Sequence, residues 1–209
     1  MVNIYSTTEE KIIAAAREVF IQKGMDGSRM QEIADRAEIN KALLHYYFRN
    51  KDKLFTKVFE DVFSNVLEMF ERIFSTETES LDAFIELFVT NYINLIRQKP
   101  FIVQFVLHEL NQNPERVAGF IRSSKIDPGK IIALISKEPE NSALQLLDPI
   151  HVMVNIMSMC IFPFLARPII KEVLLSGSDE EFESFLDIRA GQVLAFVRLA
   201  IFNNNNPTP

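Results

Sequence analysis

Apolar side chains recur every three or four residues along most of this chain, and the first 75 residues show no strand-like alternation of apolar and polar positions. The pattern opens at Thr7-Thr8-Glu9-Glu10, a capping box that predicts the start of a first helix, and Gly24 is a natural residue to end that helix. A second capping box at Ser28 predicts a short helix that continues to Ala37. Asn40 is a strong N-cap for a third helix, over residues 41–48.

The helical pattern continues to the end of the chain, interrupted at Lys99-Pro100, Asn113-Pro114 and Ser176-Gly177-Ser178. The further predicted helices share this three- and four-residue spacing and cover about 51–75, 81–99, 101–113, 114–124, 128–137, 148–165 and 179–202. Pro163 is expected to kink the helix that contains it. Residues 203–209 are polar and are expected to form a disordered tail. The predicted fold class is therefore all-α.

Residues 29–48 have the spacing of a helix-turn-helix, in which the second helix can enter the major groove of DNA. Ile33 and Ala37 face inward from the first helix, Ile39 fills the turn, and Leu44 and Tyr47 anchor the second helix. The predicted DNA contacts lie on the exposed side of helix 41–48 and beside it, and they are Ser28, Arg29, Asn40, Lys41, Ala42, Leu43, His45, Tyr46 and Lys51. Of these, the N–H groups at Ser28 and the side chains of Arg29, Tyr46 and Lys51 are expected to contact phosphates. The alternative is an ordinary three-helix bundle with a solvated polar face.

The same segment resembles the tetracycline-repressor (TetR) family of bacterial transcription regulators. The family's Tyr-Phe-x-x-Lys-x-x-Leu ending is matched by Tyr47, Phe48, Lys51 and Leu54, and the resemblance covers about residues 6–66. It implies a DNA-binding domain at 6–66, joined by a long helix to a helical dimerisation and ligand-binding domain at 67–202. It also implies a homodimer on a palindromic operator, usually a repressor that a small ligand releases.

The segment departs from the family pattern in its turn and in its recognition helix. Glu38 stands where the family has the turn glycine, so we expect a non-glycine residue held near the left-handed conformation. Ala42, Leu43 and His45 also replace residues that are common in the family. These departures leave the fold unchanged and bear on which operator sequence is read.

Composition narrows the possible classes of protein. The chain is 48% hydrophobic and 24% charged with a net charge of −6, which excludes a disordered chain and a general polyanion binder. A single cysteine excludes a disulfide framework and a cysteine-based zinc site, and it suits the reducing cytoplasm. Residues 149–166 carry no charge but keep a polar stripe, so we interpret them as a buried helix and expect no membrane partner. No catalytic, cofactor or metal motif is present, so we expect no enzyme and no cofactor.

The aromatic and methionine stripes of the later helices predict a binding cavity for a small, apolar or aromatic effector. Its predicted lining is Phe84, Phe88, Tyr92, Phe101, Phe105, His108, Met153 and Met157. The last two long helices carry more apolar residues than one protomer can cover, which predicts a homodimer. The predicted interface is Val152, Ile156, Met159, Phe185, Val193, Phe196 and Val197. Two alternatives remain open at this point: a helical enzyme or ligand carrier without DNA affinity, and a DNA-binding protein without an effector.

Overall fold

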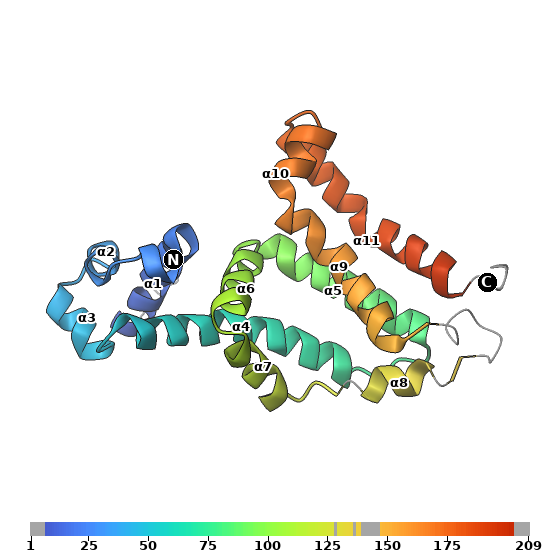
Figure 1. Cartoon of the computed structure of the whole chain (residues 1–209), viewed down its shortest axis with the longest axis horizontal. Helices are drawn as coiled ribbons and strands as arrows, with labels where there is room; N and C mark the ends of the chain where they lie inside the picture. Colours follow the sequence, from blue (N-terminus) through green and yellow to red (C-terminus); the bar gives the residue numbers. More distant parts are fainter. Residues whose placement is uncertain (1–6, 128, 136, 139–146, 203–209) are drawn as a thin grey trace, which may run out of the picture. The chain divides into compact units, whose positions relative to one another are not determined.

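The computed structural model describes residues 7–127, 129–135, 137–138 and 147–202, and every regular element in these ranges is helical (Figure 1). The all-α prediction is confirmed. The tail 203–209 lies outside the described residues, as do positions 128 and 136 of the helix predicted over 128–137. The helices are α1 (Thr8–Gly27), α2 (Met30–Arg36), α3 (Lys41–Tyr47), α4 (Lys51–Ser75), α5 (Leu81–Gln98), α6 (Phe101–Gln112), α7 (Pro114–Ser123), α8 (Gly129–Ile135), α9 (Pro149–Leu165), α10 (Arg167–Ile169), the π-helix η2 (Ile170–Leu174) and α11 (Asp179–Ile201).

Helix α1 begins at the predicted capping box. The Thr7 hydroxyl accepts a hydrogen bond from the Glu10 backbone N–H at 3.2 Å, and the Glu10 carboxylate accepts one from the Thr7 N–H at 2.7 Å. Gly24 breaks the helical geometry with φ 67° and ψ 177°, and one more turn follows before the helix ends at Gly27. Regular helical geometry therefore stops at Gly24, as predicted, and a short further turn follows the kink.

The chain divides into two compact units, each with its own core. Unit 1 contains the described residues up to Val66 together with Gln104–Ala118, and unit 2 contains Leu67–Val103 and the described residues from Gly119 onward. The break at Val66 falls where the sequence analysis divides the chain. Gln104–Ala118 also belongs to unit 1, although it lies well after Val66 in the sequence. A division of the sequence at one point could not predict this, because it depends on tertiary packing.

An aromatic cluster forms the centre of unit 1. Phe20 of α1 contacts Phe55 of α4 edge to face, with ring centroids 4.9 Å apart, and Phe55 stacks on Phe105 of α6 at 5.2 Å. Buried Glu109 on α6 accepts a hydrogen bond from Arg116 of α7 at 3.1 Å. These contacts hold α1, the first turns of α4 and the segment 104–118 together.

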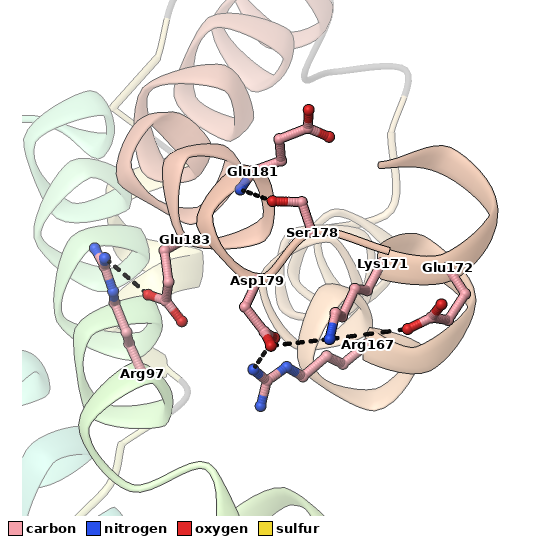
Figure 2. A network of polar contacts seen from close by, with 8 residues as sticks. All are labelled: Arg97, Arg167, Lys171, Glu172, Ser178, Asp179, Glu181 and Glu183. Atoms are coloured by element: carbon pink, nitrogen blue, oxygen red, sulfur yellow. Dashed lines mark hydrogen bonds and ion pairs between the residues drawn. The ribbon is translucent and has the colours of Figure 1, made fainter. Parts of the chain in front are cut away.

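Unit 2 is built around α5, which packs against α9 and α11. Its buried side follows the predicted stripe, and the ring of Phe74 at the end of α4 lies 5.4 Å from that of Phe84. Ion pairs join α5 to α11: Arg198 contacts Asp82 at 2.7 Å, and Arg97 contacts Asp187 at 2.6 Å. Arg97 also reaches Glu183 at 3.1 Å (Figure 2).

Between α9 and α11 the sequence predicts only the turn at Ser176-Gly177-Ser178. The segment leaves α9 at a bend of 65° after Leu165, continues through α10 and η2, and returns through a turn in which Ser176 and Gly177 have φ of 52° and 81°. Arg167 and Lys171 both contact the carboxylate of Asp179, at 3.1 and 2.9 Å (Figure 2). These ion pairs hold the segment against the first turn of α11. Between the segment and α11 lies a small apolar core formed by Ala166, Ile170, Phe182 and Leu186.

Among the described residues, no single helix has the length and apolar character needed to cross a membrane. The bent pair formed by Pro149–Leu165 and Arg167–Leu174 meets those criteria of length and composition when its two parts are taken together.

Candidate DNA-binding site

Helices α2 and α3 form a compact pair whose angle is set by buried side chains and by the backbone of the turn. Ile33, Ala34 and Leu44 are fully buried, and the Ile39 N–H donates to the Ala34 carbonyl at 3.0 Å. Glu38 has φ 56°, which confirms the prediction that a non-glycine residue occupies the left-handed region in this turn. This conformation costs an ordinary residue about 1–2 kcal/mol, a cost that the surrounding packing must offset.

The outward side of α3 carries the side chains predicted to contact base edges. Lys41, Ala42, His45 and Tyr46 are exposed, and Tyr46 retains 81% of its accessible surface. Asn40 begins the helix as predicted, because its side-chain oxygen accepts the Leu43 N–H at 2.8 Å. The helix therefore has a fixed first turn and an open outer face, which is the arrangement that a major-groove reader needs.

His45 is exposed but not free to rotate. Its Nδ1 lies 3.3 Å from the Arg49 carbonyl oxygen, so this nitrogen carries the hydrogen and donates to the carbonyl. The orientation leaves Nε2 on the opposite edge of the ring, available to a base or a phosphate. Leu43, by contrast, is half-buried, and its backbone N–H is held by Asn40.

The capping box predicted at Ser28 does not form. Arg29 is the N-cap of α2 and makes no side-chain capping hydrogen bond. Ser28 is buried, and its hydroxyl donates to the Met25 carbonyl at 2.6 Å. The prediction was wrong because the Ser28 hydroxyl closes the last turn of α1 instead of opening the next helix.

Lys51, expected to contact phosphate, is half-buried at the start of α4. Its Nζ donates to the carbonyl oxygens of Ser28 and Asp26, at 3.2 and 3.4 Å. The side chain therefore joins the first turn of α4 to the turn between α1 and α2. This geometry favours a positioning role for Lys51.

Two exposed basic residues that the sequence analysis did not select lie close to Lys51 in the chain. Arg49 and Lys53 flank the start of α4, where the Asn50 side chain accepts the Lys53 N–H at 2.9 Å. Neither forms an ion pair with the described residues, whereas Lys23 contacts Glu32 at 2.7 Å. Basic residues occupy alternate positions here, at Arg49, Lys51 and Lys53, and this pattern in the sequence could have identified the two exposed cations. In the described helix-turn-helix and at the start of α4, Arg29, Lys41, Arg49 and Lys53 are exposed and form no ion pair.

The residues predicted to line one effector cavity are divided between two spaces. Phe84, Phe88 and Met153 line a narrow apolar cavity of about 20 Å³ in unit 2. This cavity shares Ile131, Pro149 and Met153 with a wider recess of about 310 Å³. Phe105 and His108 line a different recess, in unit 1. The prediction of one common cavity is corrected accordingly, because residues 104–118 pack with the first helices.

Three further residues predicted for that cavity line none of these spaces: Tyr92, Phe101 and Met157. Tyr92 is buried close to Cys160, and burial raises the pKa of both groups, that of the Cys160 thiol to about 12. The thiol is therefore protonated and inert at neutral pH, as expected for a core cysteine.

Most residues predicted for the dimer interface lie inside the protomer. Ile156, Val193 and Val197 are buried. Val152 lines the narrow cavity, and Met159 is half-buried. Phe185 packs on Phe182, with the ring centroids 6.1 Å apart. Phe196 is the exception, with 64% of its surface exposed. The two helices instead expose another apolar set: Ile150, Val154, Phe162 and Leu165 on α9, with Ile188, Phe196 and Leu199 on α11.

The braced α2–α3 pair, with its open recognition face and unpaired cations, defines a helix-turn-helix DNA-binding protein. Residues 12–58 match the sequence profile of the family described as bacterial regulatory proteins, tetR family. Over this segment the chain is similar to transcriptional regulators of the TetR family.

Relatives and solved structures agree with this family. The probable HTH-type transcriptional regulator YttP of Bacillus subtilis (strain 168) is 28% identical over 84% of this chain and 86% of its own length. The HTH-type transcriptional repressor NicS of Pseudomonas putida is 29% identical over half of each chain. The fold resembles that of the transcriptional regulator FadR from Bacillus subtilis, solved with stearoyl-CoA, with a TM-score of 0.62, 18% identity, and 91% of this chain and 98% of that chain covered.

Proposed function

We propose that this protein is a homodimeric repressor that binds a palindromic operator and is released by a small apolar or aromatic effector. The observation that carries the DNA-binding part is the outward face of α3, which is polar and exposed on a helix anchored by fully buried Leu44. NicS, which is a repressor by name, supports the direction of control.

Recognition of the operator is divided between two sets of side chains. Lys41 and His45 on α3 face the base edges, with Ala42 small enough to let the helix approach them. Arg29, Arg49, Lys53 and the Tyr46 hydroxyl contact phosphates, which fix the register of the helix without reading sequence. Changes at Lys41 or His45 therefore alter base preference, by about 1–3 kcal/mol for a good contact.

The homodimer forms through the exposed apolar sets of α9 and α11. Water-exposed side chains such as Ile150 (73% exposed) and Leu199 (64% exposed) are unfavourable on a monomer, and a second copy can cover them by twofold symmetry. A twofold dimer presents two copies of α3 to half-sites about 34–36 Å apart, which is the reason for a palindromic operator.

The effector occupies the wide recess in unit 2, whose lining residues Ile150 and Val154 also belong to the proposed dimer face, and extends into the narrow cavity beside it. Among the described residues, both are lined almost entirely by aliphatic and aromatic side chains, and the one charged residue, Asp148, already accepts the Ile150 N–H at 2.7 Å. An apolar ligand fits this lining. FadR was solved with stearoyl-CoA, a ligand whose acyl chain is apolar and whose CoA moiety is charged.

Helix α4 connects this cavity to the DNA-binding unit along the chain. Phe84 lines the narrow cavity and contacts Phe74 in the last turns of α4. The first turns of the same helix carry Phe55, which contacts Phe20 of α1. A ligand that displaces the Phe84 ring would displace Phe74 and, with it, the last turns of α4. Release follows only if the ligand binds the DNA-incompetent state more tightly than the DNA-bound state.

The test begins with selection of genomic fragments by the full-length protein, followed by transcription in vitro. We expect an inverted repeat, and repression of a promoter that contains it. An uncharged apolar probe such as 1-dodecanol should release the DNA, and Met153→Trp, which fills the recess, should remove that response while DNA binding persists.

Each remaining alternative has its own result. Binding to an inverted repeat that no apolar probe affects would identify a DNA-binding regulator without an effector. Recovery of only non-palindromic sites would contradict the dimer. Absence of any DNA affinity would favour the helical ligand carrier.

A further inference from the structure

A second recess lies entirely within unit 1, the unit that contains the helix-turn-helix. It has a volume of about 150 Å³ and is formed by three helices: α1, α4 and α6. The lining residues are Phe20, Ile21 and Gly24 from α1, Phe55 from α4, and Gln104, Phe105 and His108 from α6. None of them belongs to the effector cavity proposed above.

The wall of this recess is aromatic. Phe55 and Phe105 stack with their ring planes 15° apart, and Phe20 meets Phe55 at 71°. The His108 ring lies 6.1 Å from that of Phe55, at 62°. Ring faces and edges that meet at these angles are the surroundings in which a further flat ring packs favourably.

Gly24 keeps the α1 side of the recess open. Its φ of 67° belongs to the region that L-residues rarely adopt, and a Cβ at this position would lie 3.5 Å from Cε1 of His108. Because the glycine carries no side chain, the bend in α1 brings bare backbone against the histidine.

Two polar groups face the recess without protein partners. Gln104 and His108 lie one turn apart on α6, and in the part of the chain that the structure describes neither side chain makes a hydrogen bond. An amide and an imidazole can together offer both a donor and an acceptor to a bound molecule. Of the residues that the structure describes, no Lys, Arg, Asp or Glu lines the space, so none of them would balance a ligand charge.

We propose that this recess binds an uncharged, single-ring aromatic molecule that carries one hydrogen-bonding group, as a phenol does. A recess of about 150 Å³ is large enough to hold a benzene-sized molecule. The ring packs against Phe55 and Phe105, and its polar group bonds to His108 or Gln104. Occupancy stabilises the contact between α1 and α4, so the ligand binds the folded DNA-binding unit and raises its stability.

The experiment uses the full-length protein with phenol as the probe, observed by ligand-detected NMR and by thermal unfolding. We expect millimolar binding, magnetisation transfer from aromatic side chains, and a rise in Tm that grows with phenol concentration. His108→Leu should weaken phenol binding about three- to tenfold, the usual effect of one neutral hydrogen bond, and leave toluene binding unchanged. Gln112→Leu, on the same helix but outside the recess, is the matched control.

A filling variant separates this site from the cavity in unit 2. The natural chain has no tryptophan, so Ile21→Trp fills the recess and reports its own burial by fluorescence. We expect Ile21→Trp to abolish phenol binding and Met153→Trp to leave it intact. The proposal is overturned if folded Ile21→Trp binds phenol like the natural protein, if Met153→Trp is the variant that loses binding, or if the natural protein does not bind phenol at millimolar concentration.

Discussion

The ammonium group of Lys51 lies 3.2 Å from the carbonyl oxygen of Ser28 and donates a hydrogen bond to it. This bond joins the first residue of α4 to the turn that precedes α2. The same amine reaches the Asp26 carbonyl, so one side chain satisfies two backbone acceptors at the junction of α1, α2 and α4. Lys51 therefore holds the helix-turn-helix against α4, and this leads to the first prediction.

Lys51→Met should lower the free energy of unfolding by about 1 kcal/mol, because two backbone acceptors lose their donor. Arg49→Met removes an exposed cation that makes no ion pair with the described residues, so it should leave stability unchanged. It should instead reduce the slope of log affinity against log salt by about 0.9, the effect of one lost phosphate contact. Urea unfolding and operator titration at two salt concentrations measure both effects. A stable Lys51→Met variant would contradict the positioning role.

A second prediction concerns the strained turn of the helix-turn-helix. Glu38→Gly should raise the free energy of unfolding by about 0.5 kcal/mol, because relief of the positive φ outweighs the greater entropy of glycine in the unfolded chain. The control is Asp35→Gly, in the neighbouring helix α2, which should lower stability by about 1 kcal/mol. Chemical denaturation measures both, and equal losses would show that the turn carries no strain.

The third prediction compares two neighbouring residues of α11. Phe196→Glu should give folded monomers, since Phe196 is 64% exposed and lies in the proposed dimer face. Val193→Glu should unfold the protein, because Val193 is 1% exposed and a buried charge there has no partner. Thr90→Glu, at an exposed position on α5, should remain a folded dimer. Analytical ultracentrifugation and circular dichroism distinguish the three outcomes, and a dimeric Phe196→Glu variant would exclude this face.

The fourth prediction follows from the buried thiol of Cys160, whose pKa burial raises from its ordinary value near 9 to about 12. The folded state holds this proton more tightly than the unfolded state, so the stabilisation is complete below pH 9 and is lost as the pH rises from 9 towards 12. Stability should fall by up to about 1.4 kcal/mol per pH unit above pH 9. Cys160→Ala should show a shallower decline, measured by urea unfolding at pH 8 and pH 10. Identical slopes in the two proteins would contradict this assignment.

Local signals predicted the helix-turn-helix closely. The cap at Asn40, the buried anchor Leu44 and the positive φ of Glu38 each follow from a few neighbouring residues, and the structure contains all three. Ser28 was misassigned because a serine at a helix junction can bond backwards as well as forwards. Which bond forms depends on the tertiary position of that junction.

The outward faces of α9 and α11 could not be predicted in the same way. Helix α9 is apolar on most sides, so periodicity does not distinguish the side that packs on α5 from the side left exposed. Buried Ile156 and exposed Val154 have the same chemistry and differ only in direction. The grouping of residues 104–118 with unit 1 and the division of the predicted cavity likewise depend on contacts between segments far apart in sequence.

The arrangement of α3 has an evolutionary consequence. Its start is fixed by Asn40, its inner side by Leu44, and its angle to α2 by the backbone at Glu38, so the outward residues contribute little to holding the helix beyond the bond from His45 to the Arg49 carbonyl. Substitutions at Lys41 and Ala42 are therefore nearly neutral for folding, and a substitution at His45 loses one exposed hydrogen bond. A duplicated copy of this gene could acquire a new operator through these positions alone, while the scaffold that presents them remains unchanged.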